Sequence, residues 1–132
     1  MDLNIVKSVR KEVEIMRDLD LYDYIVDCIY EYFEDRNVED LFLHGGCYWF
    51  ASYLHERLKH SFLMFNKEKE HCAIEIQNKL YDITGCIKST NYVLASNRQL
   101  KYMAKNYTPN FDQYKLEKYL DHMLSRVERK LG

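Results

Sequence analysis

Glycine and proline are scarce in this chain, and their positions limit where the backbone can turn sharply. The 132 residues include only four glycines and one proline. Gly45 and Gly46 stand immediately before Cys47, and Gly85 follows three residues after Asp82. Glycine adopts backbone conformations that other residues avoid. The chain therefore concentrates its backbone freedom beside a cysteine and a carboxylate, which suggests that these residues belong to a site.

Composition indicates one ordinary globular domain spanning residues 1–132. Apolar residues make up 47% of the chain and charged residues 30%, so a packed core is expected rather than disorder. The formal charge is −2 and no basic block stands out, so nucleic acid is not an expected partner. Apolar runs are short and the first residues are charged, which predicts no membrane span, no secretory signal and a cytoplasmic location.

Residues 1–43 show helical periodicity. A first helix is expected over about residues 3 to 17, with Ile5, Val9, Val13 and Met16 on one stripe. Asp20 is predicted to cap a second helix. The apolar stripe of this second helix is formed by Leu21, Tyr24, Ile25, Cys28, Ile29, Tyr32 and Phe33. Since Cys28 lies in that stripe, we expect it in the core.

Residues 44–86 change from helix to strand. CYWFASYLHERLK has a helical apolar face, SFLMFN suits a buried strand, and HCAIEIQ and KLYDIT alternate as a hairpin should. Beyond Gly85 we expect helices again, over residues 97–106 and in a long helix opened by Thr108-Pro109. Residues 87–132 are therefore predicted to be helical, and the fold class is α+β.

Cys47 has the surroundings that a cysteine nucleophile requires. The glycine pair places it in the first turn of its helix, where free backbone amides and the helix dipole favour a thiolate. The Cys47 amide itself can donate to an oxyanion. Such a thiol also needs an imidazole base and a group that orients it. His71, at the head of the hairpin, and Asp82, on its second strand, are the candidates.

The register of the hairpin decides whether Asp82 reaches His71. With a turn at residues 77–78, Asp82 lies diagonal to His71 and within side-chain reach. With a turn at 78–79, Asp82 faces Glu75 and is too far for a direct hydrogen bond, and Glu75 becomes an alternative acid. In both registers Cys72, Ile74, Ile76, Tyr81 and Ile83 share the opposite face, which we expect to be the core. The helix bearing Cys47 would then meet the hairpin on the face of His71 and Asp82.

Three motifs together resemble the catalytic core of the papain-like and transglutaminase-like superfamily: GGCYWFASYLHERL, HCAIEI and YDITG. In that superfamily a cysteine at a helix N-terminus is followed by His and Asp on adjacent strands. More narrowly, the pattern is similar to small phage and bacterial proteins with a Gly-x-Cys helix start and a His…Tyr-Asp-Ile-x-Gly hairpin. The matched region covers residues 44–86, roughly a third of the chain.

This resemblance implies that a nucleophile-bearing helix packs on a small antiparallel sheet, with Cys47 as nucleophile, His71 as base and Asp82 as the orienting acid. It implies a cysteine-dependent amide or thioester hydrolase or acyltransferase (a peptidase, deamidase or transglutaminase-like enzyme) that forms a thioacyl intermediate. A protein or peptide substrate is expected, and no cofactor. The sequence departs from the superfamily where Cys72 and Ala73 follow the histidine, since many relatives carry an aromatic residue there.

Other interpretations of these residues stay open. Gly46, Tyr48 and Trp49 are predicted to form the substrate and oxyanion region, although aromatic core packing suits at least one of the aromatic pair. A zinc site formed by His44, Cys47, His71 and Cys72 is disfavoured because neighbouring strand residues face opposite ways. We therefore expect no metal. His55 lies just over two helical turns beyond Cys47 and could approach the site, but a partly buried or surface position is favoured. The alternative function is a non-catalytic phage-type or mobile-element-type protein that binds a host protein.

Overall fold

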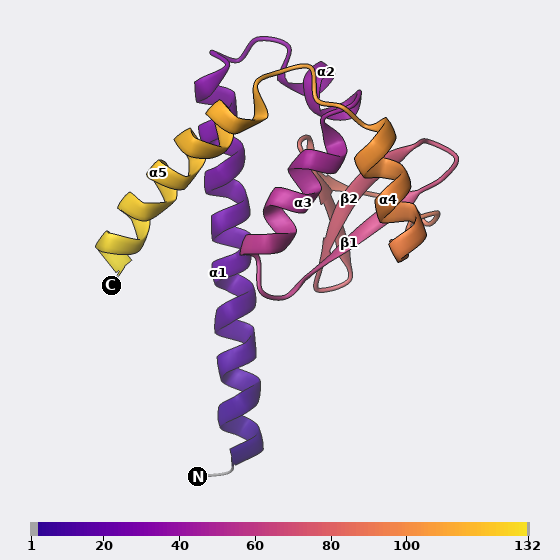
Figure 1. Ribbon diagram of the computed structural model, residues 1–132. Helices are drawn as coiled ribbons and strands as arrows, with labels where there is room; N and C mark the ends of the chain where they lie inside the picture. Colours follow the sequence, from indigo (N-terminus) through magenta and orange to yellow (C-terminus); the bar gives the residue numbers. More distant parts are fainter. Residues whose placement is uncertain (1–2, 132) are drawn as a thin grey trace.

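The computed structural model describes residues 3–131 and has an α+β fold, as the sequence predicts (Figure 1). Two helical regions enclose an antiparallel sheet. In chain order the elements are α1 (Leu3–Tyr32), α2 (Val38–Leu43), α3 (Cys47–Arg57), β1 (Ser61–Asn66), β2 (His71–Ile76), β3 (Lys79–Asp82), β4 (Gly85–Ile87), β5 (Val93–Leu94), α4 (Asn97–Asn106) and α5 (Gln113–Leu131).

Helix α1 is continuous, so the predicted break at Asp20 is wrong. No glycine or proline interrupts this stretch, and an exposed aspartate is tolerated inside a helix at small cost. The aspartate that caps backbone amides is Asp18, which is buried. Its two carboxylate oxygens accept from the amides of Lys59 and His60, at 3.2 and 2.7 Å. Asp18 thus anchors the connection between α3 and β1 to the long helix.

The sheet has the strand order β4-β3-β2-β1-β5, and every pairing is antiparallel. Strands β2 and β3 pair Ile76 with Lys79, so the turn lies at residues 77–78. Gln77 and Asn78 both have positive φ, 51° and 64°, as a two-residue type I′ hairpin requires. Of the two predicted registers, the structure has the one that places Asp82 diagonal to His71.

Four further elements complete the comparison with the sequence prediction. Residues 38–43, in the region expected to be helical, form the short helix α2. Residues 85–94 contain the short strands β4 and β5, where a return to helix was expected. The last helix begins at Gln113 rather than at Thr108-Pro109, because the Asp112 side chain accepts from the Lys115 amide at 3.1 Å and caps the helix there.

The core lies between the sheet and the helices α1 and α3. It includes Cys72, Ile74 and Ile76 from β2, the face predicted to be buried. Helix α3 packs on this face, and Cys47 belongs to the same cluster as Cys72. The expectation that α3 would meet the opposite face is therefore wrong: the buried side chains of α3 belong to the same apolar cluster as the core face of β2. Cys28 is also in the core, as predicted.

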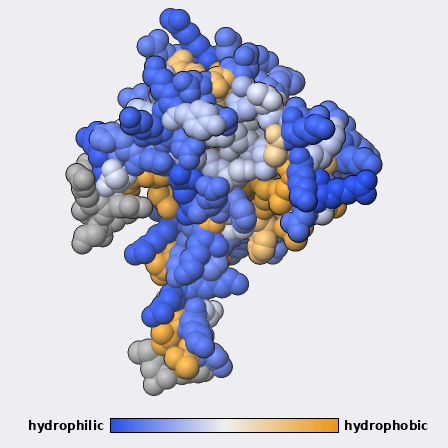
Figure 2. Space-filling view, viewed as in Figure 1, coloured by the Kyte–Doolittle hydropathy of each residue, from blue (hydrophilic) through white to orange (hydrophobic). Residues whose placement is uncertain are grey.

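The first half of α1 projects beyond the rest of the molecule (Figure 1). Its predicted stripe is exposed: Ile5, Val9, Val13 and Met16 keep 44 to 64% of their accessible surface. In the space-filling view, apolar patches are visible along this projection (Figure 2). Among the described residues, no helix combines the length and continuous apolar character needed to cross a membrane.

Candidate active site

The glycine pair sets the backbone that leads into Cys47. Gly45 has φ +94°, and a Cβ there would lie 2.8 Å from the carbonyl oxygen of Thr108. A Cβ on Gly46 would lie 2.5 Å from the carbonyl oxygen of Leu41 and 3.1 Å from the Phe111 ring. The two distances to carbonyl oxygens are shorter than real Cβ contacts, so any larger residue would force the neighbouring backbone to move. The chain needs glycine at both positions to place Cys47 at the first position of α3.

Cys47 is 2% exposed and lies against the start of β2. A hydrogen bond from the Cys72 thiol lowers the pKa of Cys47; burial opposes this, and bonds from the His71 ring and the Cys72 amide add to it. The net effect lowers the pKa of the Cys47 thiol to about 5. The lowered pKa favours the thiolate form of the buried Cys47 at neutral pH.

Cys72 has a single thiol proton and two possible acceptors. Its Sγ lies 2.8 Å from Met103 Sδ in α4, and it also faces the sulfur of Cys47. A thiolate accepts hydrogen bonds far better than a thioether, so the proton points to Cys47 when Cys47 is ionised. This interaction, followed by burial, strongly raises the pKa of Cys72. Of the two thiols, Cys47 is the one that ionises more easily, and Cys72 keeps its proton.

His71 joins the thiolate to Asp82. Its Nε2 lies 3.0 Å from Asp82 Oδ2, which leaves Nδ1 as the ring nitrogen available to Cys47. Burial alone would lower the pKa of His71, but the hydrogen bonds with Asp82 and Cys47 outweigh it and raise the pKa to about 9. His71 is 8% exposed, so the charged ring depends on these two partners.

Asp82 is held at the end of β3 by neighbours on both sides. Its Oδ1 accepts from the Thr84 amide at 2.8 Å and from the Thr84 hydroxyl. The Tyr22 hydroxyl of α1 donates to its backbone carbonyl. Burial raises the pKa of Asp82, but the hydrogen bonds from His71 and Thr84 lower it by more. The pKa of Asp82 is therefore below its ordinary value. Asp82 therefore stays ionised and fixes the orientation of the His71 ring.

The three groups form one charge-stabilised chain. The lowered pKa of Cys47 and the raised pKa of His71 both favour a thiolate beside an imidazolium near neutral pH. A thiolate beside an imidazolium is the reactive form of a cysteine nucleophile. The imidazolium can also protonate a leaving group. The arrangement can thus attack a carbonyl carbon and supply the proton that the departing group needs.

Two segments cover the site. The Tyr92 ring meets the His71 ring edge to face, with centroids 6.3 Å apart. The connection between α4 and α5 lies over the glycine pair through Thr108 and Phe111. Beside this cover is a groove of about 390 Å³, and its lining includes Gly45, Glu70 and Tyr107. The groove is the open surface next to the start of α3.

Tyr107 has a buried hydroxyl with no hydrogen-bond partner among the described residues. Burial raises its pKa, and the charges of Cys72, Glu70 and Cys47 raise it further. An orphaned buried hydroxyl is costly and calls for an explanation, such as a role in binding. Asn66, which pairs with His71 across the sheet, also has a buried and unpartnered amide nitrogen.

The other predicted site residues lie in different settings. The Gly46 amide donates to the Leu41 carbonyl at 3.1 Å, so it is not free for an oxyanion. Trp49 stacks on Tyr53 at 5.2 Å and contacts Phe111, so it packs in an aromatic cluster. Tyr48 is half-buried against the core.

The structure also gives the positions of the residues named in the alternative interpretations. His55 is exposed, with Nδ1 3.2 Å from Ser61 Oγ, and does not reach Cys47. Glu75 pairs with Leu80, so Asp82 is the acid that bonds His71. His44 is exposed and pairs with Asp40 at 3.8 Å. Within residues 3–131 no group of three or more His, Cys, Asp or Glu side chains has the arrangement of a metal site.

Sequence reasoning missed several residues of this site. Cys72 was assigned to the core from parity, and its position directly after His71 was the signal that it could reach the same thiol. Thr84 was not missed: a bond from Asp82 to the turn backbone near Thr84 and Gly85 was one interpretation of the sequence, and the Thr84 amide makes it. Tyr92 and Tyr107 lie far along the chain, and nothing in the local sequence connects them to Cys47.

Comparison with known proteins identifies the family. A family model described as "Phage YunG-like protein" matches residues 25–121, most of the chain. The chain belongs to the phage YunG-like family. The match includes the whole Cys47–His71–Asp82 arrangement, while the projecting half of α1 lies outside it. No curated protein matches this phage YunG-like chain. No solved structure matches it either.

Proposed function

We propose that this chain is a cysteine-dependent amide or thioester hydrolase or acyltransferase with a papain-like or transglutaminase-like core. The observation that carries the proposal is the buried chain from Cys47 through His71 to Asp82, in which each group stabilises the charge of the next. Buried ionised groups with strongly shifted pKa values concentrate at active sites. The start of a helix adds further stabilisation to the thiolate.

The reaction follows from the positions of the protons. Cys47 Sγ attacks the carbonyl carbon, and the carbonyl oxygen becomes an oxyanion. As the intermediate collapses, the amine or thiol of the substrate leaves with the proton from His71, and the acyl group stays on Cys47 as a thioester. Neutral His71 then takes a proton from water or from an amine acceptor, which attacks the thioester and releases Cys47. Asp82 keeps the His71 ring in the same orientation throughout.

The oxyanion needs two donors. The Cys47 amide, at the N-terminus of α3, is one. We assign the second to the Tyr107 hydroxyl, because it is buried without a partner among the described residues and Tyr107 shares a groove with Gly45. Loss of one such donor slows acylation by roughly a hundredfold, which is the effect expected of Tyr107→Phe. Tyr102→Phe is the matched control, since the exposed Tyr102 ring lies 6.2 Å from the Tyr107 ring.

An acyl-transfer assay tests the proposal directly. The protein is incubated with the acetyl thioester of N-acetylcysteamine, and acetylated residues are located by mass spectrometry. Acetylation of Cys47 is expected, slowed strongly by His71→Ala and unchanged by Cys86→Ser, since Cys86 is exposed and free. The proposal fails if Cys47 is not acylated, or if acylation is equally fast in the His71→Ala variant.

The burial of Cys47 favours a second candidate function, a phage-type protein that binds a host protein without catalysis. A thiol that is 2% exposed reaches a substrate only after Tyr92 or the segment around Thr108 moves. The two functions differ in what Cys47→Ala does to a folded chain. A hydrolase or transferase loses its effect on the bacterial host, whereas a binding protein keeps it.

A further inference from the structure

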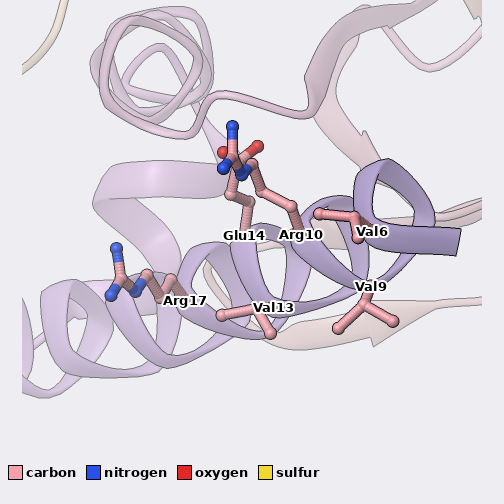
Figure 3. A pocket seen from close by; sticks show the side chains of 6 residues that line it. All are labelled: Val6, Val9, Arg10, Val13, Glu14 and Arg17. Atoms are coloured by element: carbon pink, nitrogen blue, oxygen red, sulfur yellow. The ribbon is translucent and has the colours of Figure 1, made fainter. Parts of the chain in front are cut away.

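The projecting half of α1 has an apolar stripe with the spacing of a coiled coil. Val6, Val9, Val13 and Met16 are separated by three, four and three residues, which matches the first and fourth positions of a heptad. Val9 is 53% exposed, Val13 44% and Met16 64%. Figure 3 shows Val9 and Val13 projecting to the same side of the helix, while Arg10 and Glu14 point to the other side in this view.

This stripe faces away from the body of the molecule. The buried side of α1 is formed by Ile15, Asp18, Tyr22, Ile25, Cys28 and Ile29. Each residue turns an α-helix by about 100°, so most of these side chains lie on the side opposite to Val9 and Val13. A second helix can therefore pack on the stripe without displacing α3 or the sheet from α1.

The stripe has a defined end. The same heptad positions continue with Asp20, Asp23 and Asp27, which are all exposed. Facing carboxylates repel one another, so a helix pair would separate after Met16. The apolar contact is thus limited to about two heptads, and α1 beyond it stays bound to its own body.

The charges beside the stripe match a parallel copy of the same helix. With Val6 and Val13 at the first heptad position, Glu12 lies directly before Val13, and Arg17 lies directly after Met16 at the fourth position. In a parallel pair these flanking positions meet across the interface, five residues apart. Glu12 would then face Arg17 of the second copy twice, by symmetry. An antiparallel pair would instead bring Arg10 and Arg17 of the two copies to the same side.

We propose that the chain forms a parallel homodimer through Val6, Val9, Val13 and Met16. Valine occupies both first heptad positions, Val6 and Val13, as in many two-stranded coiled coils, although the fourth positions are Val9 and Met16 rather than leucine. Two heptads are fewer than a freestanding coiled coil uses, but here the second half of α1 is already held in the helix by the body. The costly first turn of helix is therefore formed before the copies meet. The inference does not depend on the proposed catalytic function.

Sedimentation equilibrium of the full chain over a range of concentrations tests the dimer. Val9→Glu places a charge inside the interface, and we expect the dissociation constant to rise roughly tenfold or more. Ser8→Glu is the matched control: it adds the same charge at an exposed neighbouring position outside the stripe and is expected to leave the constant unchanged.

The orientation is tested by charge exchange and cross-linking. Glu12→Arg is expected to weaken the dimer about fivefold, and adding Arg17→Glu is expected to restore it. In a Cys86→Ser background, Val9→Cys is expected to cross-link on oxidation, since equivalent core positions lie within disulfide range. Ser8→Cys is expected to stay monomeric on a denaturing gel.

Three results would overturn the proposal. The first is that the chain sediments as a monomer at every concentration. Binding of the stripe to vesicles or to another protein would not rescue the proposal in that case. Another is a dimer that Val9→Glu does not weaken, since the contact would then lie elsewhere. The third is cross-linking of Ser8→Cys as fast as Val9→Cys, which would exclude the parallel arrangement.

Discussion

The hairpin site and the projecting half of α1 both have periodic sequences, but their side chains differ in burial. At the site, His71 and Asp82 are more than nine-tenths buried and bond to groups on other elements. Along the projection, Val9 and Met16 are more than half exposed. A substitution at the site must therefore disturb several elements, whereas one on the projection disturbs little within the monomer. The contrast shows that periodicity identifies a face, while only neighbouring elements decide whether that face is buried.

The largest effect is expected from Gly46→Ala. The new methyl group would lie 2.5 Å from the Leu41 carbonyl oxygen, so α2 and the start of α3 must separate. We expect a loss of about 3 kcal/mol in the free energy of unfolding, measured by urea denaturation. Gly85→Ala is the matched control, because nothing lies within 4 Å of its Cβ position and only its positive φ adds strain. Equal losses in the two variants would contradict the close packing above Cys47.

The second-largest effect is expected in the pH dependence of the free energy of unfolding. Between the lowered pKa of Cys47, about 5, and the ordinary pKa of His71, 6.5, only the folded chain has lost the Cys47 proton. The unfolded chain then binds one proton more, so stability rises with pH. At about 1.4 kcal/mol per pH unit, the gain is about 2 kcal/mol.

Above pH 6.5 the gain should stop. The unfolded histidine loses its proton there, while folded His71 keeps its own up to about pH 9, and this offsets the Cys47 difference. The measurement is the free energy of unfolding of the unaltered chain minus that of Cys47→Ala, from pH 5 to 6.5. A difference that does not grow with pH over this range would mean that Cys47 is not ionised.

A smaller effect is expected from Tyr22→Phe. The buried Tyr22 hydroxyl donates to the Asp82 carbonyl and ties α1 to the end of β3. We expect a loss of about 1 kcal/mol in urea denaturation. Tyr24→Phe removes a longer bond from the same helix, 3.4 Å to the Met123 carbonyl, and is expected to cost less. The reverse order would indicate that α1 does not help to position Asp82.

The smallest effect is expected on the projection. Val13→Ser removes apolar surface that is already 44% exposed. At concentrations where the chain is monomeric, the free energy of unfolding should change by no more than about 0.5 kcal/mol. A loss close to that of Gly46→Ala would mean that the stripe packs within its own chain, and the contrast between the two regions would fail.

Much of the fold follows from local pattern. Helix α3 and the hairpin strands β2 and β3 have clear periodicity, but the turn between them has no Asn-Gly or Asp-Gly pair, so the sequence left two registers open and the structure has the turn at Gln77 and Asn78. Strands β4 and β5 have three and two residues, too few to show a period, so they were predicted as part of a helical region. The break at Asp20 was predicted from a residue that caps helices, while the residue that caps here is Asp18, through contacts 41 and 42 positions away.

The site was predictable to the extent that it lies on neighbouring elements. Cys47 was indicated by the glycine pair, and the approach of Asp82 to His71 by the hairpin register. The tyrosines at positions 92 and 107 could not be connected to it, because tertiary packing alone brings them there. The face on which α3 packs was predicted wrongly, since parity relates strand residues to one another but does not say from which side a helix approaches.

The central claim is that Cys47 is a thiolate held by His71 and Cys72, and the pH profile of its alkylation tests this most directly. The rate of iodoacetamide labelling at Cys47 is followed by mass spectrometry, with exposed Cys86 as the reference in the same sample. Because Cys47 is buried, the midpoint of the profile is compared rather than the absolute rate. We expect a midpoint near pH 5, raised in both His71→Ala and Cys72→Ala. A midpoint near the ordinary thiol value of about 8.5, unchanged in these variants, would contradict the account.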